Sequence, residues 1–333
     1  MLSVPTVLAG NRLSISRLLT QVENQTPESR AALAELFAHT GRAHLIGVTG
    51  APGTGKSSLV NQLTLHYRKQ RNQKVAIIAV DPSSPFTGGA VLGDRVRMRD
   101  LSGDDGVFIR SMASRGSVGG LAQTTAAFTQ VFDAAGYEVI IIETVGAGQS
   151  EVDIARLAHT TLVVEAPGLG DDIQAIKAGI LEIADVLVIN KADRPGVENT
   201  ERALRTTLEL AHPTQRLFRH HGQTLSAAMP ESASTTLWIP PINKTVATDG
   251  TGIADLAESI AQHVAHIRSS GDWAHRDRAR LGSEVEALLA EALMLRFFDA
   301  VQKSEYEKLL EQVIQRQLSP YEAVEILIHG KLK

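Results

Sequence analysis

The chain has no cysteine among its 333 residues, which excludes disulfide bonds, thiolate catalysis and cysteine-ligated zinc or iron–sulfur centres. Aromatic residues form only 4% of the sequence, so a surface that stacks nucleic-acid bases is not expected. No apolar run reaches the roughly 18 residues that a membrane-spanning helix requires. The formal net charge is -4 without a long basic run, which argues against nucleic acid and membrane surfaces as partners. These absences favour a globular protein of the cytoplasm.

The N-terminal segment is also short of acidic residues. Residues 1–22 contain Arg12 and Arg17 but no Asp or Glu, which is a weak likeness to a transit peptide. The apolar side chains of the same segment fall on one helical face, so we favour an amphipathic helix over 11–23. A second helix is expected over 28–39, because Thr-Pro before it is a typical helix start.

Six short apolar runs alternate with helical patterns in the middle of the chain. Such a pattern indicates an α/β fold with a mostly parallel sheet flanked by helices. Ligands of these sheets bind at the carboxyl ends of the strands. A further strand is expected at 237–239, followed by a helix over 252–268. The six runs are Leu45–Thr49, Val75–Val80, Val107–Arg110, Val139–Ile142, Thr161–Val164 and Val186–Ile189.

Two regions differ from this alternating pattern. Residues 211–236 are rich in His, Ser, Thr and Ala and predict a long surface loop. The C-terminal region predicts three helices, over 273–298, 303–316 and 320–329. We expect three parts: an N-terminal helical extension (1–42), a nucleotide-binding domain (43–270) and a helical segment for dimerisation or partner docking (271–333). A helical cap on the same core is the alternative reading of the last part.

The most specific motif follows the first predicted strand. Residues 50–57 read G-A-P-G-T-G-K-S and match the phosphate-binding loop G-x-x-x-x-G-K-[ST] without a mismatch. In such a loop the backbone N–H groups and the helix N-terminus hold the phosphates, Lys56 reaches the β- and γ-phosphates, and the Ser57 hydroxyl ligates Mg²⁺. The sequence therefore predicts a P-loop NTPase. Its expected nucleotide contacts here are Gly50, Ala51, Pro52, Gly53, Thr54, Gly55, Lys56, Ser57 and Ser58.

A second motif lies at the end of another apolar run, which finishes in Glu143 with Gly146 three residues later. This is the Walker B and switch II pattern, in which the carboxylate holds Mg²⁺ and the glycine N–H senses the γ-phosphate. The residue after the glycine is Ala147 and not the glutamine that positions water in Ras-type proteins. We therefore expect slow hydrolysis without a partner, below about 1 s⁻¹.

Guanine recognition is indicated by N-K-x-D at Asn190, Lys191 and Asp193. The Asp193 carboxylate accepts hydrogen bonds from N1–H and the 2-amino group of guanine, and adenine offers neither donor. This motif is weak alone, but here it follows a P-loop and a buried strand. The loop Val246-Ala247-Thr248 lies where GTPases place a backbone N–H against guanine O6, although an ordinary loop would look the same.

Two more acids belong to the candidate metal site. Asp81 follows the strand that ends at Val80, and Asp94 lies in a switch-like segment after it. With Ser57 and Glu143 they form the candidate Mg²⁺ ligands, because hard oxygen ligands suit this ion. Turn and helix-cap chemistry is the alternative role for both acids.

Together these motifs closely resemble the methylmalonyl-CoA mutase-associated GTPases of the MeaB/ArgK type, in the metallochaperone-like class of P-loop GTPases. The resemblance runs from about residue 8 to the C-terminus. Its matching stretches are 47–58, 80–84, 88–89, 92–95, 108–110, 142–146, 148–151, 167–171, 174–177 and 190–193.

The resemblance implies functions that composition does not show. Such proteins are homodimers that bind GTP or GDP with Mg²⁺ and chaperone an adenosylcobalamin-dependent acyl-CoA mutase. They gate cofactor loading, protect the mutase from inactivation and are accelerated by it. Residues 167–177 match the family's additional switch, which makes Lys177 a candidate catalytic residue that contacts the nucleotide or transmits its state.

The chain departs from the family pattern at three places. Ser117 stands where relatives often carry His, the segment 211–236 is longer than expected, and the guanine loop reads Val246-Ala247 instead of Ser-Ala. Three other functions compete with the mutase chaperone: a metal-delivery GTPase, a kinase and a non-hydrolysing scaffold. The client mutase is not determined by the sequence, and methylmalonyl-, isobutyryl-, 2-hydroxyisobutyryl- and ethylmalonyl-CoA mutases are all candidates.

Overall fold

The structure is a computed structural model that describes residues 3–82, 98–101, 103–114, 118–144, 155–168, 183–211, 217–220, 223–226, 237–301 and 303–329. The chain divides into two compact units, Met1–Arg280 and Leu281–Lys333. Among the described helices, none is both long and apolar enough to cross a membrane.

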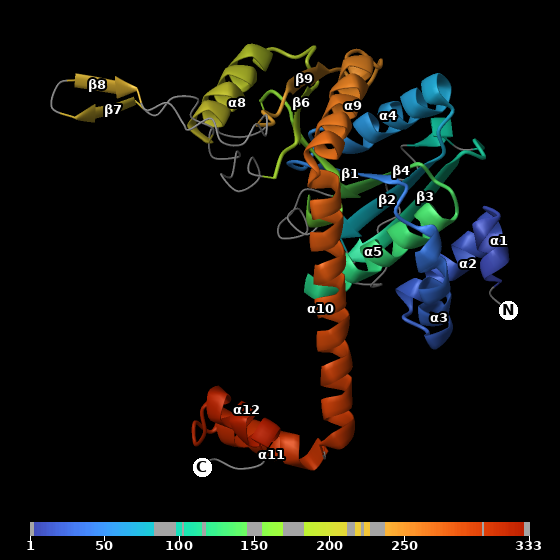
Figure 1. Ribbon diagram of the computed structural model, residues 1–333, viewed down its shortest axis with the longest axis vertical. Coiled ribbons are helices and arrows are strands. Elements are labelled where there is room, and N and C mark those ends of the chain that lie inside the picture. The colour runs from blue at the N-terminus through green and yellow to red at the C-terminus, as the bar shows by residue number, and fades with distance from the viewer. Residues whose placement is uncertain are drawn as a thin grey trace. The chain divides into compact units, whose positions relative to one another are not determined.

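The first unit is built on a seven-stranded sheet in the order β3-β2-β4-β1-β5-β6-β9 (Figure 1). Every neighbouring pair in this sheet is parallel. The predicted α/β fold and all six predicted strands are confirmed. The strands are β1 His44–Thr49, β2 Val75–Pro82, β3 Val107–Ser114, β4 Val139–Thr144, β5 Thr160–Glu165, β6 Val186–Asn190 and β9 Ile242–Thr245.

The strand predicted at 237–239 is wrong, because the last strand of the sheet is β9. Pro240 and Pro241 explain the difference, since proline has no N–H to donate to a ladder. Pairing begins only at the Pro241 carbonyl, which accepts from Leu187 N–H over 2.9 Å. Trp238 instead donates its indole N–H to the Asp185 carbonyl over 2.8 Å.

The segment predicted as a long loop contains a short antiparallel pair. Strands β7 (Leu217–His220) and β8 (Gln223–Ser226) pair with each other and form a separate two-stranded sheet. The rest of 212–236 lies outside the described residues.

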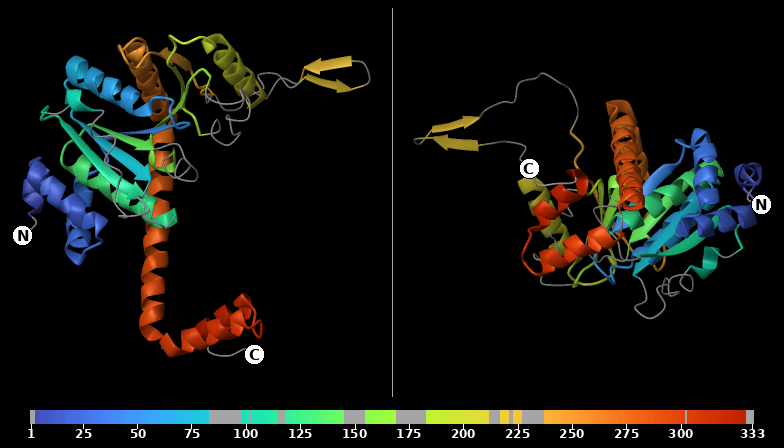
Figure 2. Two further views of the ribbon diagram at one scale, coloured as in Figure 1. Left: turned by 180° about the vertical axis from the view of Figure 1, so that it is seen from behind. Right: turned by 90° about the horizontal axis from the view of Figure 1, so that it is seen from below.

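Helices α4 (Lys56–Arg71) and α9 (Ile253–Ser270) cover one face of the main sheet (Figure 2). The strands turn every second side chain toward them, as a pleated strand requires. The buried cluster on this face joins Val48 and Ile141 of the sheet to Leu59 of α4 and Leu256 of α9. Helix α4 starts directly after the glycine-rich loop, so its packing fixes that loop against the sheet.

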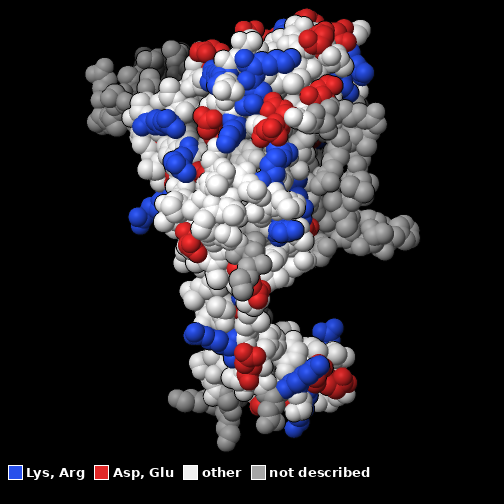
Figure 3. Space-filling view, turned by 90° about the vertical axis from the view of Figure 1, so that its right-hand side faces the viewer, with Lys and Arg blue, Asp and Glu red and all other residues white. Residues whose placement is uncertain are grey.

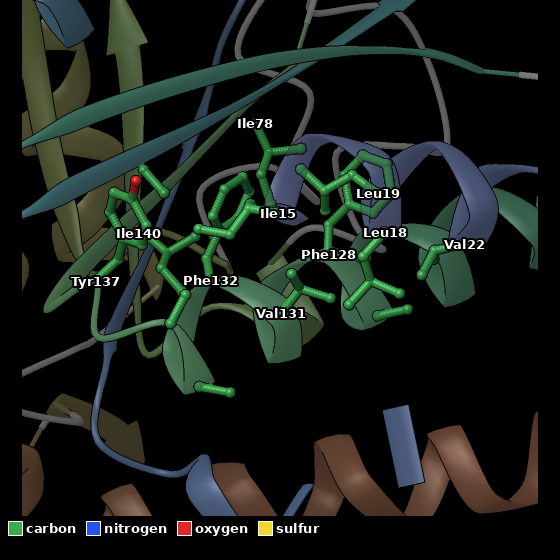
Figure 4. Packing of buried hydrophobic residues seen from close by; sticks show 14 of the residues in the cluster. Ile15, Leu18, Leu19, Val22, Ile78, Phe128, Val131, Phe132, Tyr137 and Ile140 are labelled. Atoms are coloured by element: carbon green, nitrogen blue, oxygen red, sulfur yellow. The ribbon is translucent and has the colours of Figure 1, made fainter. Parts of the chain in front are cut away.

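The opposite face carries α5 (Val118–Ala134) and the N-terminal helices. The N-terminal helices are α1 (Val4–Leu8), α2 (Arg12–Glu23) and α3 (Pro27–Leu36), the last followed by a 3-10 turn (Phe37–His39). Both helices predicted before residue 40 are therefore present. Figure 4 shows Ile15, Leu18, Leu19 and Val22 of α2 beside Phe128, Val131 and Phe132 of α5. The N-terminal helices thus share the core of the first unit.

A third cluster lies at the β6 side of the sheet, where α8 (Val197–Ala211) packs Leu204 and Leu208 against Leu187 and Ile189. A 3-10 turn, η2 (Arg99–Leu101), lies between β2 and β3 in the chain.

On the surface, charged side chains of both signs are interspersed over the face shown in Figure 3, as on an ordinary solvated surface.

The amino edge of the sheet holds the first turns of α10 (Asp272–Ala300). Asp185, directly before β6, accepts two hydrogen bonds from the Arg276 guanidinium, at 2.8 and 2.9 Å. It also accepts from Thr161 N–H at 2.8 Å and lies 3.2 Å from His263 Nε2. Burial alone would raise the pKa of Asp185, but the hydrogen bonds from His263 and Arg276 outweigh it and hold this pKa below its ordinary value.

The second unit contains the rest of α10 with α11 (Lys303–Ile314) and α12 (Pro320–His329), as the sequence predicts. Ser319 and Glu322 form a reciprocal capping box at the start of α12, with hydrogen bonds of 2.9 and 3.2 Å. Many large apolar side chains of this unit are exposed. They are Val285, Leu288, Leu289, Leu293, Met294, Leu295, Phe298, Leu310, Ile314, Tyr321, Val324 and Ile328.

Candidate functional site

The glycine-rich loop connects β1 to α4 and lies at the carboxyl edge of the sheet. All three of its glycines have backbone conformations that other residues rarely adopt, with φ of 139° at Gly50, 83° at Gly53 and 93° at Gly55. A side chain at Gly50 would collide with the Val164 carbonyl, and one at Gly55 with the Asn190 amide. The loop therefore needs glycine at these positions to lie this close to β5 and β6.

Lys56 is 5% exposed and lies at the centre of this loop. Its Nζ donates to the carbonyl oxygens of Gly50 and Ala51, over 2.7 and 3.0 Å. Thr54 is fully buried, and its hydroxyl also donates to the Ala51 carbonyl, over 3.0 Å. Of the other predicted phosphate contacts, Pro52, Gly53 and Ser58 are exposed. The loop is thus folded around the lysine with several backbone positions open to a ligand.

Ser57 and Glu143 meet as the sequence predicts. The Ser57 hydroxyl donates to Glu143 Oε1 over 2.6 Å, and Glu143 is 4% exposed. A hydroxyl and a carboxylate at the carboxyl edge are hard oxygen donors of the kind that Mg²⁺ prefers. This donor set fits the predicted metal site.

The remaining predicted members of the phosphate and metal site are only partly described. Asp81 lies on β2, two residues beyond Ala79, which pairs with Glu143, but its side chain is outside the described residues. Asp94, Gly146 and Lys177 lie outside the described residues altogether.

Asn190 connects three segments that are distant in the sequence. Its side-chain N–H donates to the Thr54 carbonyl over 2.8 Å, and its Oδ1 accepts from Ala247 N–H over 3.1 Å. The Thr245 hydroxyl adds a third bond, of 3.2 Å to the same Oδ1. Lys191 Nζ donates to the Gly53 carbonyl over 2.6 Å. The N-K-x-D segment therefore holds the phosphate loop and the candidate guanine loop together.

The candidate base-binding residues border this connection. Asp193 is exposed, so its carboxylate is accessible to a ligand. Within the loop 246–248, Val246 N–H donates to the Thr251 carbonyl over 3.0 Å and Ala247 N–H to Asn190. The exposed residue Thr248 follows them. Two of the three N–H groups of this loop, those of Val246 and Ala247, therefore donate to acceptors within the protein.

Several residues of the site carry no motif that sequence reasoning could detect. Thr49 and Thr144 are each about 1% exposed, and Thr144 Oγ1 donates to Thr49 Oγ1 over 3.2 Å. Glu165 is a buried acid at the end of β5, 9% exposed, and Thr245 supports Asn190. The one feature these four residues share is that each is the polar last residue of its strand.

Comparison with known proteins shows the family of the chain. A sequence model of the family described as "Methylmalonyl Co-A mutase-associated GTPase MeaB" matches residues 15–302. A putative GTPase of Pyrococcus horikoshii is 41% identical over 319 residues, which cover 96% of this chain and 94% of the relative. A methylmalonic aciduria type A homolog of Caenorhabditis elegans is 30% identical over 81% of this chain and 67% of its own.

A solved structure shows the same fold. The crystal structure of a LAO/AO transport system kinase superposes with a TM-score of 0.68 at 26% identity, over 98% of this chain and 95% of that one. The family match and the GTPase relatives show that the protein hydrolyses GTP on a P-loop GTPase fold. The chain belongs to the MeaB family of methylmalonyl-CoA mutase-associated GTPases.

Proposed function

We propose that the protein is a GTP-hydrolysing chaperone of an adenosylcobalamin-dependent acyl-CoA mutase. It would gate loading of the cobalamin cofactor and protect the mutase from inactivation. The observation that carries this proposal is the family match over residues 15–302, since the family is described as mutase-associated. The relative named for methylmalonic aciduria type A supports the same class of client.

In this proposal GTP binds across the carboxyl edge of the sheet. The amides of the glycine-rich loop and Lys56 hold the phosphates, and the Asp193 carboxylate selects guanine through its N1–H and 2-amino donors. Asn190 and Lys191 hold the N-K-x-D segment at a fixed distance from the glycine-rich loop, through their hydrogen bonds to the carbonyl oxygens of Thr54 and Gly53. Thr248 supplies the loop amide for guanine O6, because the N–H groups of the two residues before it are used within the protein.

Ser57 and Glu143 would hold Mg²⁺, with Asp81 and Asp94 as further candidates. When bound, the ion neutralises charge on the β- and γ-phosphates. The chain itself fixes the positions of these oxygen donors. Strand β4 carries the buried Glu143 carboxylate and the first turn of α4 carries the Ser57 hydroxyl, and the two lie within hydrogen-bonding distance.

Hydrolysis then depends on charge stabilisation and on positioning. The Lys56 ammonium and the loop amides are donors set in place before the reaction, and they stabilise charge on the transferring phosphoryl group. Ala147 cannot orient water as the glutamine of Ras-type proteins does. Lys177, in the stretch that matches the family's additional switch, would contact the nucleotide or transmit its state to the mutase. Turnover of the isolated protein should therefore stay below about 1 s⁻¹.

We also propose that two copies of the chain form a homodimer in the cytoplasm. Helix α10 has 29 residues and buries none of its side chains. The exposed apolar residues of Leu281–Lys333 would be covered by a second copy, since so many large apolar side chains exposed in one region are uncommon on a monomer.

The experiment that tests the chaperone proposal is GTP turnover of the purified protein, alone and with each candidate acyl-CoA mutase. We expect slow turnover alone and an acceleration of at least about tenfold by one mutase, as partner-activated GTPases show. Unchanged turnover with all of the candidate mutases would contradict the proposed client and leave the GTPase assignment intact. Ovalbumin at the same concentration controls for non-specific protein effects.

A further inference from the structure

Two buried threonines lie where strands β1 and β4 end. These strands are parallel neighbours, and Val48 pairs with Glu143, so Thr49 and Thr144 form the next pair along. Their hydroxyl groups are 3.2 Å apart and hydrogen-bonded, and each side chain is about 1% exposed. Gly50, the first residue of the phosphate loop, follows Thr49. The bond therefore joins the strand that carries the phosphate loop to the strand that carries Glu143.

Packing alone does not explain hydroxyl groups at these positions. The rest of both strands is filled mainly by apolar residues, such as Ile46 on β1 and Ile142 on β4. Valine has nearly the shape of threonine and would fill the same space without burying polar atoms, whose burial is unfavourable unless they are paired. The hydroxyl pair offsets that penalty but adds little stability over two valines. The hydroxyl pair differs from a valine pair in that a hydrogen bond is directional. It therefore fixes the relative position of the two strand ends more tightly than apolar contact does.

The geometry points to Thr49 and Thr144 as positioning residues for GTP hydrolysis. Glu143 and Thr144 project from opposite faces of β4, since side chains alternate along a strand. The hydroxyl pair therefore acts through the backbone. It fixes the position of β4 relative to β1, and so fixes the position of the Glu143 carboxylate relative to Ser57, which lies in the first turn of α4. A displacement of about 1 Å at such a site lowers a rate by up to about a hundredfold.

The test compares Thr144→Val, which removes the hydroxyl at nearly constant shape, with Thr144→Ser, which keeps it. We expect Thr144→Val to lower kcat for GTP about tenfold while KM changes less than about twofold. The Mg²⁺ concentration that gives half of the maximal rate should rise. In a binding readout without turnover, Mg²⁺ should strengthen GDP affinity less than in the unmodified protein. Thr144→Ser should restore all three quantities.

Two further variants distinguish positioning from general stability. The double variant Thr49→Val/Thr144→Val should be no slower than either single variant, because all of them remove the same bond. Thr129→Val is the matched control. It removes a buried hydroxyl of α5 that donates to the Ala126 carbonyl over 2.7 Å, away from the site, and kcat should not change.

Three results would overturn the proposal. The first is a Thr144→Val protein with unchanged kcat and unchanged Mg²⁺ response. The second is a loss of activity that Thr144→Ser does not restore, and the third is a loss that follows only the fraction of unfolded protein, as measured by thermal unfolding. The test concerns GTP turnover and nucleotide binding by the protein alone, so it does not depend on the identity of the mutase.

Discussion

At the scale of single residues, the site separates the groups that hold phosphate from those that recognise the base. Lys56 is buried in the glycine-rich loop, whereas Asp193 is exposed beyond β6. Asn190 joins the two parts through bonds to Thr54 and Ala247. Base selection can therefore be altered at Asp193 without disturbing the phosphate loop.

Replacing Asp193 by Asn should weaken GTP binding about tenfold to a hundredfold, because one of two acceptor oxygens becomes a donor that faces the guanine 2-amino group. Competition between GTP and ATP for a fluorescent GDP analogue measures this loss of preference. Xanthosine triphosphate carries a carbonyl oxygen in place of the 2-amino group and should bind the variant better than it binds the original protein. Glu198→Gln, on the exposed start of α8, is the matched control. Unchanged competition in Asp193→Asn would show that guanine is recognised elsewhere.

At the scale of elements, the start of α10 is attached to the amino edge of the sheet by contacts with the neutral side chain of His159. His159 Nδ1 accepts from Leu45 N–H over 3.1 Å, which leaves Nε2 to donate to Asp277 over 3.1 Å. Trp273 of α10 stacks on this ring, with 3.8 Å between centroids. Burial lowers the pKa of His159 below its ordinary value of 6.5, against the opposing effect of Asp277. A proton on Nδ1 would face the Leu45 N–H, so protonation breaks the contact.

The sign of the pH dependence follows from this depressed pKa. Below about pH 6.5 the unfolded chain binds a proton at His159 that the folded chain resists, so the free energy of unfolding falls as the pH falls. The pKa of Asp277 is lowered to about 2, so this carboxylate stays ionised until far lower pH. We expect the thermal midpoint to drop by several degrees between pH 7.5 and pH 5.

Thermal unfolding in a pH series, followed by tryptophan fluorescence, measures this drop. A His159→Gln variant keeps an acceptor and a donor but does not titrate, and its midpoint should fall less over the same range. His39→Gln is the control, because His39 lies in the 3-10 turn of the N-terminal helices. Equal pH dependence in His159→Gln and the original protein would contradict the assignment.

At the scale of the whole molecule, the first unit has a large buried core, whereas the described residues of the second unit leave many large apolar side chains exposed. Leu281–Lys333 exposes a dozen large apolar side chains, and its described buried residues include Leu309 and Ala323. Three helices with so little interior are stable when a second surface covers them.

Replacing Leu293 by Glu should therefore weaken the proposed homodimer about a hundredfold or more, because the change removes apolar burial and places a charge in the interface of both copies. Sedimentation equilibrium over a range of concentrations measures the dimer dissociation constant. Glu286→Gln, on the same helix and exposed, is the matched control and should leave it unchanged. A Leu293→Glu protein that still sediments as a dimer, or an original protein that is monomeric, would place the interface elsewhere or remove it.

The sequence alone determined the parts of this protein that are local in the chain. The glycine-rich loop, the six buried strands and the helices before and after the sheet were all predictable, because each depends on residues within one short segment. The last strand was misplaced, since Pro240 and Pro241 delay pairing to β9. The motifs also predicted that Ser57 and Glu143 belong to one site, but the tertiary structure alone decided the contacts that no motif indicates. Thr49 meets Thr144, Asn190 meets Thr54, and Asp185 meets Arg276, at separations of 95, 136 and 91 residues. These contacts depend on strand order and register, which no short segment of the sequence contains.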